Sequence, residues 1–177
     1  MKKIGLLSDT HSYLDQNIFE YFKECDELWH AGDIGSMEVV EKLQAFKPLK
    51  AVYGNIDHGV LRQEFPLDLR FDCEGLDVFI THIGGYPGRY NKRVRELLRA
   101  DPPKLYICGH SHILKIMPDK QLDFLHINPG ACGVHGFHRE KTIVRFGIEE
   151  GKIQDVEVIN LGTVSYTHLT LPTICSV

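Results

Sequence analysis

The chain has 177 residues, of which 43% are hydrophobic, and 20 basic against 24 acidic side chains give it a formal net charge of −4. This balance argues against the basic surface typical of a nucleic-acid scaffold, and no apolar run approaches the roughly 20 residues that span a bilayer. Length and composition therefore favour one soluble, cytoplasmic domain whose five scattered cysteines stay reduced, with no membrane contact and no stable nucleic-acid complex.

The first third of the chain alternates short apolar strands with helices. Three strands are expected, at Ile4–Leu7, Leu28–Ala31 and Ala51–Tyr53. The first helix is expected to begin at Ser12 as its N-cap, because Leu14, Ile18 and Phe22 recur at the spacing of a helix face. Ser36 is the expected cap of a second helix. This alternation is the pattern of successive βα units.

The rest of the chain predicts hairpins and one further helix. Strands are expected at Leu69–Phe71, Val78–Thr81, Leu105–Cys108, Ile113–Met117, Leu122–Ile127, Thr142–Ile148 and Lys152–Ile159. The first two and the last two of these flank short Glu-Gly turns, so each pair is expected to form a hairpin. A helix is expected at Asn91–Ala100, with Val94, Leu97 and Leu98 inward. Repeated βα units followed by hairpins indicate an α/β protein with two packed sheets.

The last fifteen residues differ from the rest of the chain, since Thr163–Val177 contains no charged residue and no glycine. The stretch Val164–Thr173 resembles the translation of one reading frame of a transposon-end adapter used in DNA sequencing libraries. We therefore expect the native domain to occupy residues 1–162. Residues 163–177 are interpreted as a non-native tail and are left out of the reasoning about the fold.

Five of the expected strands end in residue types that bind metal ions. The loops after these strands supply, in chain order, Asp9, His11, Asp33, Asn55, His82, His110 and His112. Strands that end at one side of a sheet bring their following loops together. Two divalent cations about 3.5–4 Å apart need several neutral imidazoles and at least one carboxylate that offsets their charge. The sequence therefore predicts that these seven side chains form a two-metal site.

The order of these motifs resembles that of the calcineurin-like metallophosphoesterases, and most closely that of the small YfcE-like phosphodiesterases of bacteria and archaea. The resemblance extends from Lys2 to Leu161 and includes the Asn128-Pro129-Gly130 turn. It implies an α/β fold, a four-layer αββα sandwich of two mixed sheets flanked by helices. It also implies a division of the ligands: one metal held by Asp9, His11 and His112, the other by Asn55, His82 and His110, and both bridged by Asp33.

The resemblance further implies a metal-dependent phosphoric ester hydrolase. A hydroxide that bridges the two metals would attack phosphorus in line with the leaving oxygen, and the metals would lower the pKa of that water. The expected substrates are phosphodiesters, and also monoesters, of small molecules or nucleotides. Mixed nitrogen and oxygen ligation favours Mn²⁺, with Fe, Zn²⁺, Co²⁺ or Ni²⁺ as alternatives that depend on supply.

The chain departs from the superfamily at one motif. Many phosphoprotein phosphatases of the superfamily read Gly-Asn-His-Glu, with a His linked to protonation of the leaving group, where this chain reads Gly54-Asn55-Ile56-Asp57-His58. Because Ile56 cannot donate a proton, Asp57 and His58 are the candidate catalytic residues, Asp57 by orienting a neighbour and His58 as the acid. The departure argues against a protein phosphatase.

The sequence leaves two other functions open. One is a non-catalytic metal-binding scaffold resembling the small retromer subunit, although a scaffold has no need of all seven ligands. The other is a metal-dependent nuclease, which would usually bring extra domains and a basic face. His135, His138 and Arg139 are expected either to line a substrate groove or to lie at a subunit contact of a homo-oligomer. Arg89 is a candidate partner of a phosphate oxygen.

Overall fold

Two five-stranded sheets form the body of the protein in a computed structural model, which describes residues 1–164. The strand order is β12-β11-β1-β2-β3 in the first sheet and β4-β5-β8-β10-β9 in the second. The first sheet consists of β1 (Lys2–Leu7), β2 (Glu27–His30), β3 (Leu49–Ala51), β11 (Glu140–Glu149) and β12 (Lys152–Thr163). The second consists of β4 (Asp68–Cys73), β5 (Leu76–Thr81), β8 (Leu105–Ile107), β9 (Leu114–Asp119) and β10 (Phe124–Pro129).

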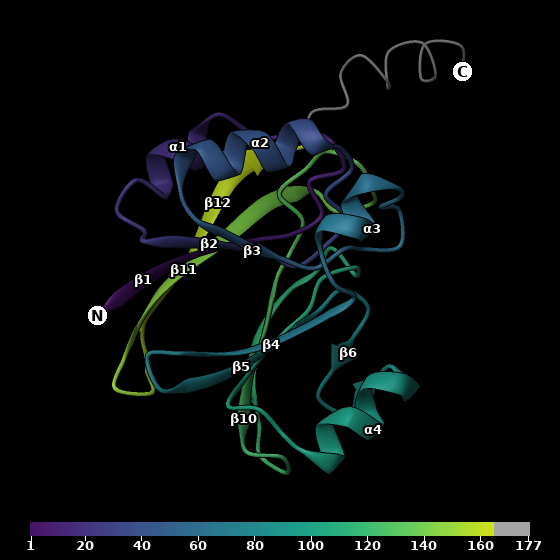
Figure 1. The fold of residues 1–177 in the computed structure, drawn as a ribbon, viewed down its shortest axis with the longest axis vertical. Helices are drawn as coiled ribbons and strands as arrows, with labels where there is room; N and C mark the ends of the chain where they lie inside the picture. The colour runs from purple at the N-terminus through teal and green to yellow at the C-terminus, as the bar shows by residue number, and fades with distance from the viewer. Residues whose placement is uncertain (165–177) are drawn as a thin grey trace.

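Helices cover the outer sides of the two sheets. The remaining elements are α1 (Asn17–Tyr21), α2 (Met37–Phe46), α3 (Val60–Glu64), α4 (Lys92–Ala100) and the hairpin strands β6 (Gly85–Tyr86) and β7 (Arg89–Tyr90). Helices α1 and α2 lie over the first sheet, and α4 lies beyond the second, at the opposite end of the molecule (Figure 1). Both sheets contain parallel and antiparallel pairs. The predicted four-layer αββα sandwich of two mixed sheets is therefore confirmed.

Alternating side chains of the first sheet contribute to two separate apolar layers. Leu6 of β1 is wholly buried between the sheets, in a cluster with Ile80 and Ile107 of the second sheet. Its neighbour Leu7 points to the other face and packs in the cluster that includes Val40 of α2. Because successive strand residues face opposite sides, one apolar run supplies both layers. This explains why β1 reads as a continuous hydrophobic segment.

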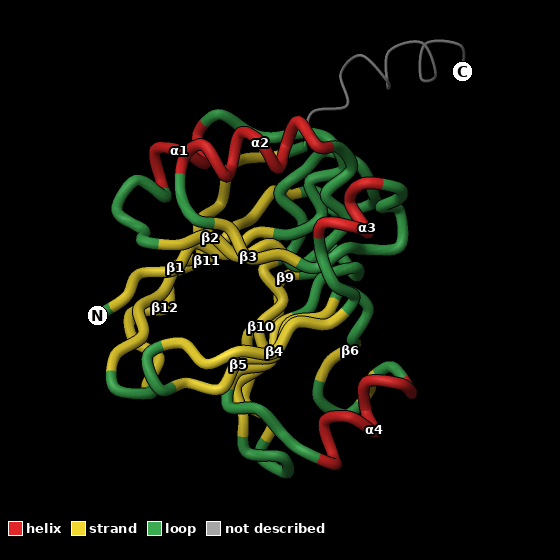
Figure 2. The backbone as a smooth tube through the Cα atoms, viewed as in Figure 1, coloured by secondary structure: helices red, strands yellow, loops and turns green. Residues whose placement is uncertain are grey.

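Parallel pairing aligns the carboxyl ends of the strands that precede the predicted ligands. In the first sheet Leu7 lies opposite His30, and His30 lies opposite Ala51. In the second sheet Ile80 lies opposite Ile107. The loops that follow these strands gather at one side of the molecule, as Figure 2 shows. Ligand-type residues that are far apart in the sequence can therefore meet there.

Two expectations about the helices differ from the structure. Helix α1 begins at Asn17 rather than at Ser12, which has a φ of 68°. Ser12 lies in a turn because its N–H donates to Ile34 O at 2.9 Å. This segment therefore pairs with the loop after β2 and does not begin the helix. In α4, Val94 is buried as expected, but Leu97 is 44% exposed. The buried face of this short helix is therefore narrower than the spacing of its apolar residues predicts.

Strand β12 includes the first residue of the predicted tail. Thr163 is the last residue of β12, and Val164 is buried and donates its N–H to Arg139 O at 2.7 Å. The other residues of the predicted tail, 165–177, lie outside the described residues. The interpretation of residues 163–177 as a non-native tail stays a prediction. Within residues 1–164 no helix is both long and apolar enough to cross a membrane.

Candidate metal centre

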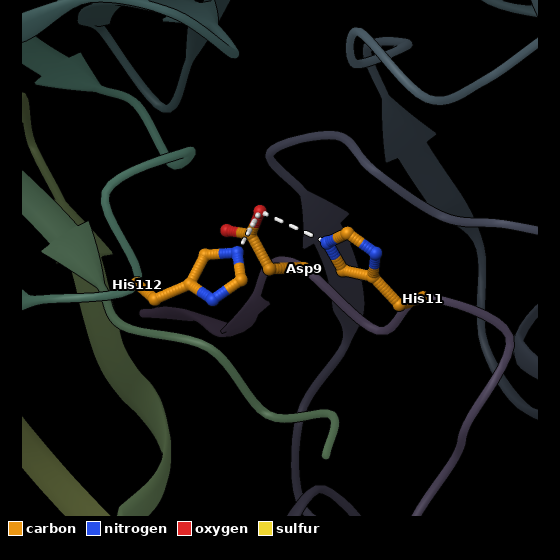
Figure 3. Close-up of side chains that lie close together, drawn as sticks. All are labelled: Asp9, His11 and His112. Carbon is orange, nitrogen blue, oxygen red and sulfur yellow. Dashed lines mark ion pairs between the residues drawn. The ribbon is translucent and has the colours of Figure 1, made fainter. Parts of the chain in front are cut away.

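The loops after β1, β2, β5 and β8 bring six of the seven predicted ligands into two groups. Asp9, His11 and His112 have ligand atoms that lie within 4.8 Å of one another. The same holds for the second group, Asp33, His82 and His110. Figure 3 shows the first group, in which the rings of His11 and His112 lie on either side of the Asp9 carboxylate. This grouping follows the predicted division, with Asp33 in the second group.

The carboxylate of Asp33 connects the two groups. His11 Nε2, from the first group, lies 3.4 Å from Asp33 Oδ2, and His82 Nε2, from the second, lies 3.2 Å from the same oxygen. Asp9 Oδ1 lies 3.2 Å from His112 Nε2 and 3.8 Å from His82 Nε2. An oxygen within reach of both groups is what a bridging ligand needs.

Asn55 reaches the site through His110. Its Oδ1 lies 3.0 Å from His110 Nδ1, and both side chains are exposed at the mouth of the site. The loop after β3 thus joins the loop after β8. Asn55 offers a neutral oxygen on the same side as His110, where the second predicted metal position lies.

The backbone at the site is unusual for residues other than glycine. Five of the seven predicted ligands have a positive φ: Asp9 (56°), His11 (46°), Asp33 (56°), His110 (71°) and His112 (63°). The left-handed region destabilises such a residue by roughly 1–2 kcal/mol. Backbone of this kind persists where the surrounding structure enforces it, and it clusters at functional sites. The loops after β1, β2 and β8 therefore turn sharply where they carry ligand-type side chains.

Three polar atoms at the centre of the site are buried without a hydrogen-bond partner among the described residues. They are Asp9 Oδ1, His11 Nε2 and His82 Nε2. A buried polar atom without a partner destabilises the fold by about 1–3 kcal/mol. All three atoms are good donors to a divalent transition metal, and imidazole nitrogen with carboxylate oxygen suits Mn, Fe, Co, Ni or Zn. The residues present therefore fit bound metal.

Each carboxylate is oriented through one of its two oxygens. Ser8 Oγ donates to Asp9 Oδ2 at 2.7 Å, and His110 N donates to the same oxygen at 3.2 Å. Ile56 N donates to Asp33 Oδ1 at 3.0 Å. These bonds leave Asp9 Oδ1 and Asp33 Oδ2 directed at the histidines. Partners of this kind fix the geometry of metal ligands.

Burial and the histidines act in opposite directions on both carboxylates. Burial raises the pKa of Asp33, but the imidazoles of His11 and His82 outweigh this effect and hold the pKa below its usual range. Burial likewise opposes ionisation of Asp9, and the neighbouring His112 and His82 again lower the pKa. Both side chains are therefore negatively charged at neutral pH, as the binding of cations requires.

His30 is a buried residue that joins the first two ligand loops. Its Nδ1 accepts from Gly32 N at 3.1 Å, and its Nε2 lies 3.0 Å from Thr10 Oγ1. Because Nδ1 is an acceptor, Nε2 carries the proton and donates to Thr10, whose hydroxyl donates to Ile34 O at 2.8 Å. Burial lowers the pKa of His30 to about 4, so the ring is neutral at neutral pH.

The two predicted catalytic residues lie in different surroundings. Asp57 is buried, and its carboxylate accepts from the backbone N–H groups of Ile34 (3.1 Å), Gly35 (2.8 Å) and Gly54 (2.7 Å). It thereby holds the loop after β2, which carries Asp33, against the loop after β3. His58 is exposed. The geometry supports a positioning role for Asp57, and the role of His58 as an acid stays a prediction.

Replacement of Asp57 by alanine is expected to lower the free energy of unfolding by about 3 kcal/mol, because three N–H groups, two of them buried, lose a charged acceptor. Metal affinity is expected to fall by roughly 10–100-fold, as for other residues that support ligands. Denaturant unfolding and metal titration measure the two effects. Glu64→Ala, which removes an exposed carboxylate of α3, is the control and should stay within about 0.5 kcal/mol. Equal results for the two variants would show that the contacts of Asp57 are dispensable.

A pocket of about 490 Å³ opens over the two groups, and the 135–138 loop forms part of its wall. The ring of His135 stacks on that of His11, with 4.7 Å between the ring centroids. His138 Nδ1 lies 3.2 Å from His112 Nδ1. Of the two roles expected for His135 and His138, these positions favour lining a substrate groove over forming a subunit contact. Phe137 on the same loop is fully exposed, and no sequence pattern had singled it out.

Arg89 does not lie at the metal centre. It belongs to β7 and lines a separate pocket with Arg95, Arg99 and Asp119. That pocket contains none of the predicted ligands. The β6–β7 hairpin carries Arg89 toward α4, so the expected contact between Arg89 and a phosphate at the metal centre has no support in this structure.

Comparisons with known proteins identify the family to which this fold and these ligand groups belong. The sequence profile of the calcineurin-like phosphoesterase superfamily domain matches residues 1–151. A "Probable metallophosphoesterase" of Methanothermobacter thermautotrophicus is 28% identical over 168 residues, covering 90% of this chain and 92% of that protein. The chain belongs to the calcineurin-like phosphoesterase superfamily.

Two solved structures illustrate how widely the fold is shared. An archaeal phosphodiesterase is 24% identical, with a TM-score of 0.73 and coverage of 90% of this chain and 99% of that one. Vps29 of Chaetomium thermophilum is 13% identical, with a TM-score of 0.72 and coverage of 93% and 100%. At these identities the similarity shows the fold alone, so the activity has to be argued from the site.

Proposed function

We propose that this protein is a two-metal phosphoesterase that hydrolyses phosphodiester bonds, and also monoester bonds, of small molecules or nucleotides. The observation that carries the proposal is the pair of adjoining ligand groups that both reach Asp33 Oδ2. One cation would be held by Asp9, His11 and His112, the other by Asn55, His82 and His110, and both by Asp33. When bound, the cations would polarise the phosphoryl oxygens and lower the pKa of a water molecule.

The chain itself contributes positioning and charge, and the proposal needs no nucleophilic side chain. The buried carboxylates of Asp9 and Asp33 offset the charge of the cations, and Asp57 fixes the loops around Asp33. His135 and His138 line the space where the substrate binds. His58 is proposed as the acid that protonates the leaving oxygen. The expected cation is Mn²⁺, with Fe, Zn²⁺, Co²⁺ and Ni²⁺ as alternatives.

Hydrolysis of bis-p-nitrophenyl phosphate tests this function. The purified protein is expected to release p-nitrophenol, to lose this activity after treatment with a chelator, and to regain it with Mn²⁺. An aryl ester suits the site because a good leaving group needs little protonation, and the position of the superfamily histidine is occupied by Ile56. Undiminished turnover by the metal-free protein would contradict the two-metal mechanism.

A non-catalytic metal-binding scaffold is the alternative function. Exposed hydrophobic side chains at the mouth of the site favour it, since Phe137 is fully exposed and Ile113 is 62% exposed, and such residues often mark protein contacts. The presence of all seven ligand-type residues favours the enzyme. The same assay separates the two, because a scaffold would bind metal without turning over any ester.

A further inference from the structure

A smaller pocket, of about 200 Å³, adjoins the pocket over the metal centre. The two pockets share His110 and Ser111 in their walls. Strand β6 contributes Tyr86 to the smaller pocket, and the paired strands β9 and β10 contribute Lys115 and His126. We call it the side pocket. A group bound in it would lie next to a group bound at His110.

Lys115 is a cation without an anionic partner among residues 1–164. The partly buried Lys2 and the buried Lys141 are paired with carboxylates at 3.0 and 2.8 Å, respectively. Lys115 Nζ instead lies 3.7 Å from the centroid of the Tyr86 ring. No carboxylate of the described chain lines the side pocket. Because a cation–π contact holds an ammonium group in place without neutralising it, the charge remains available to a ligand.

Two more hydrogen-bond donors belong to the same walls. His126 is wholly buried, and no hydrogen bond of ordinary geometry reaches either of its ring nitrogens among residues 1–164, although the backbone of Tyr106 lies close enough for a weak one. Burial, and next the charge of Lys115, lower the pKa of His126 to about 4, so the neutral ring carries one N–H at neutral pH. Ser111 Oγ accepts from Asn128 Nδ2 at 3.0 Å and from Ile113 N at 3.2 Å, which leaves its own hydrogen for another acceptor.

We propose that the side pocket binds a second phosphate group of the substrate. Ammonium, hydroxyl and imidazole donors line it together, and charge-assisted hydrogen bonds from such groups are those that phosphate oxygens accept best. The inference rests on the proposed function and narrows its substrate class. The preferred substrates are phosphodiesters that carry a further phosphate on one ester arm, as in a nucleotide with phosphates at two positions of its sugar.

A matched pair of substrates tests the inference. Thymidine 5′-(p-nitrophenyl phosphate) and the same ester with a 3′-phosphate differ only in the second phosphate, and both release p-nitrophenol. For the Mn²⁺-loaded protein, kcat/KM is expected to be about 10-fold or more higher for the 3′-phosphorylated ester, as one charged hydrogen bond allows. Lys115→Ala should remove most of this preference through KM and leave turnover of the plain ester within about 2-fold.

Two further variants serve as controls. Lys115→Arg keeps the positive charge and should keep most of the preference, and Lys120→Ala removes an exposed lysine outside the side pocket and should change nothing. An equal kcat/KM for the two esters, or an equal loss on both in Lys115→Ala, would overturn the inference while the proposed function stands. If neither ester is hydrolysed, the proposed function fails. Calorimetry with thymidine 3′,5′-bisphosphate and thymidine 5′-monophosphate then tests the side pocket. The bisphosphate is expected to bind more tightly, and Lys115→Ala is expected to lose this difference. If Lys115→Ala binds both nucleotides as the parent protein does, the inference is overturned.

Discussion

Asp33→Asn is expected to lower kcat/KM for a phosphodiester by about 1000-fold or more. Groups that merely orient metal ligands already account for roughly 10–100-fold. Asp33 Oδ2 lies within 3.4 Å of a histidine of each ligand group, whereas Asp9 Oδ1 lies 3.8 Å from His82 of the second group. The amide would have the same shape but no charge, so both cations would lose an anionic ligand at once. Metal content, measured by elemental analysis, should fall from two equivalents together with the rate.

A matched control exists for this substitution. Asp155 is exposed, and its φ of 53° is close to the 56° of Asp33, so Asp155→Asn repeats the same chemical change in the same backbone conformation. It should leave rate and metal content unchanged. His112→Ala affects the first group only and should lose less metal than Asp33→Asn. Near-normal turnover of Asp33→Asn with two bound metals would show that Asp33 is no bridge.

The sequence predicted an α/β protein with two packed sheets because its strands carry strong local signals. The apolar run Ile4–Leu7 and the Glu-Gly turns of the hairpins locate strands without reference to the rest of the chain. The convergence of Asp9, Asp33 and His82 follows from one rule, that the loops at the carboxyl ends of aligned strands meet. Ser12 and Leu97 were misassigned for the opposite reason. Ser12 is held in a turn by its hydrogen bond to Ile34 O, and Leu97 lies outside the narrow buried face of α4. Neither tertiary contact can be inferred from the local sequence pattern.

Other parts of the site could not be predicted, since they depend on contacts made only after folding. Nothing in the composition around Asp57 indicates that it accepts from three backbone N–H groups. The left-handed backbone at five ligand-type residues is equally invisible in the sequence. In the sequence Lys115 resembles any lysine of a strand, because its contact with Tyr86 of β6 forms only in the folded protein. The spacing of His135 and His138 was a signal, but it fitted a groove and a subunit contact equally well.

Gly54→Ala is expected to damage both the fold and the metal centre. A Cβ at position 54 would overlap Asp33 N and Asp33 Oδ1. Neither atom can move aside, because Asp33 Oδ1 accepts from Ile56 N and the carbonyl of Asp33 accepts from His11 N at 3.0 Å. Overpacking of this kind lowers the free energy of unfolding by about 1–3 kcal/mol. Since the displaced atoms belong to the bridging residue, activity should fall by about 100-fold or more.

Comparison with Gly88→Ala separates the close contact from the general effect of losing a glycine. Gly88 has a φ of 91° and nothing within 4 Å of its would-be Cβ, so alanine there brings backbone strain alone. That strain should lower stability by about 1 kcal/mol and leave metal content unchanged. Gly54 has the opposite requirement, because its backbone suits any residue and only the space beside Asp33 is missing. Loss of metal in Gly54→Ala but not in Gly88→Ala, at matched loss of stability, would therefore locate the damage at Asp33. Equal metal content in both variants would show that the Asp33 carboxylate tolerates displacement and that its position is less critical than proposed.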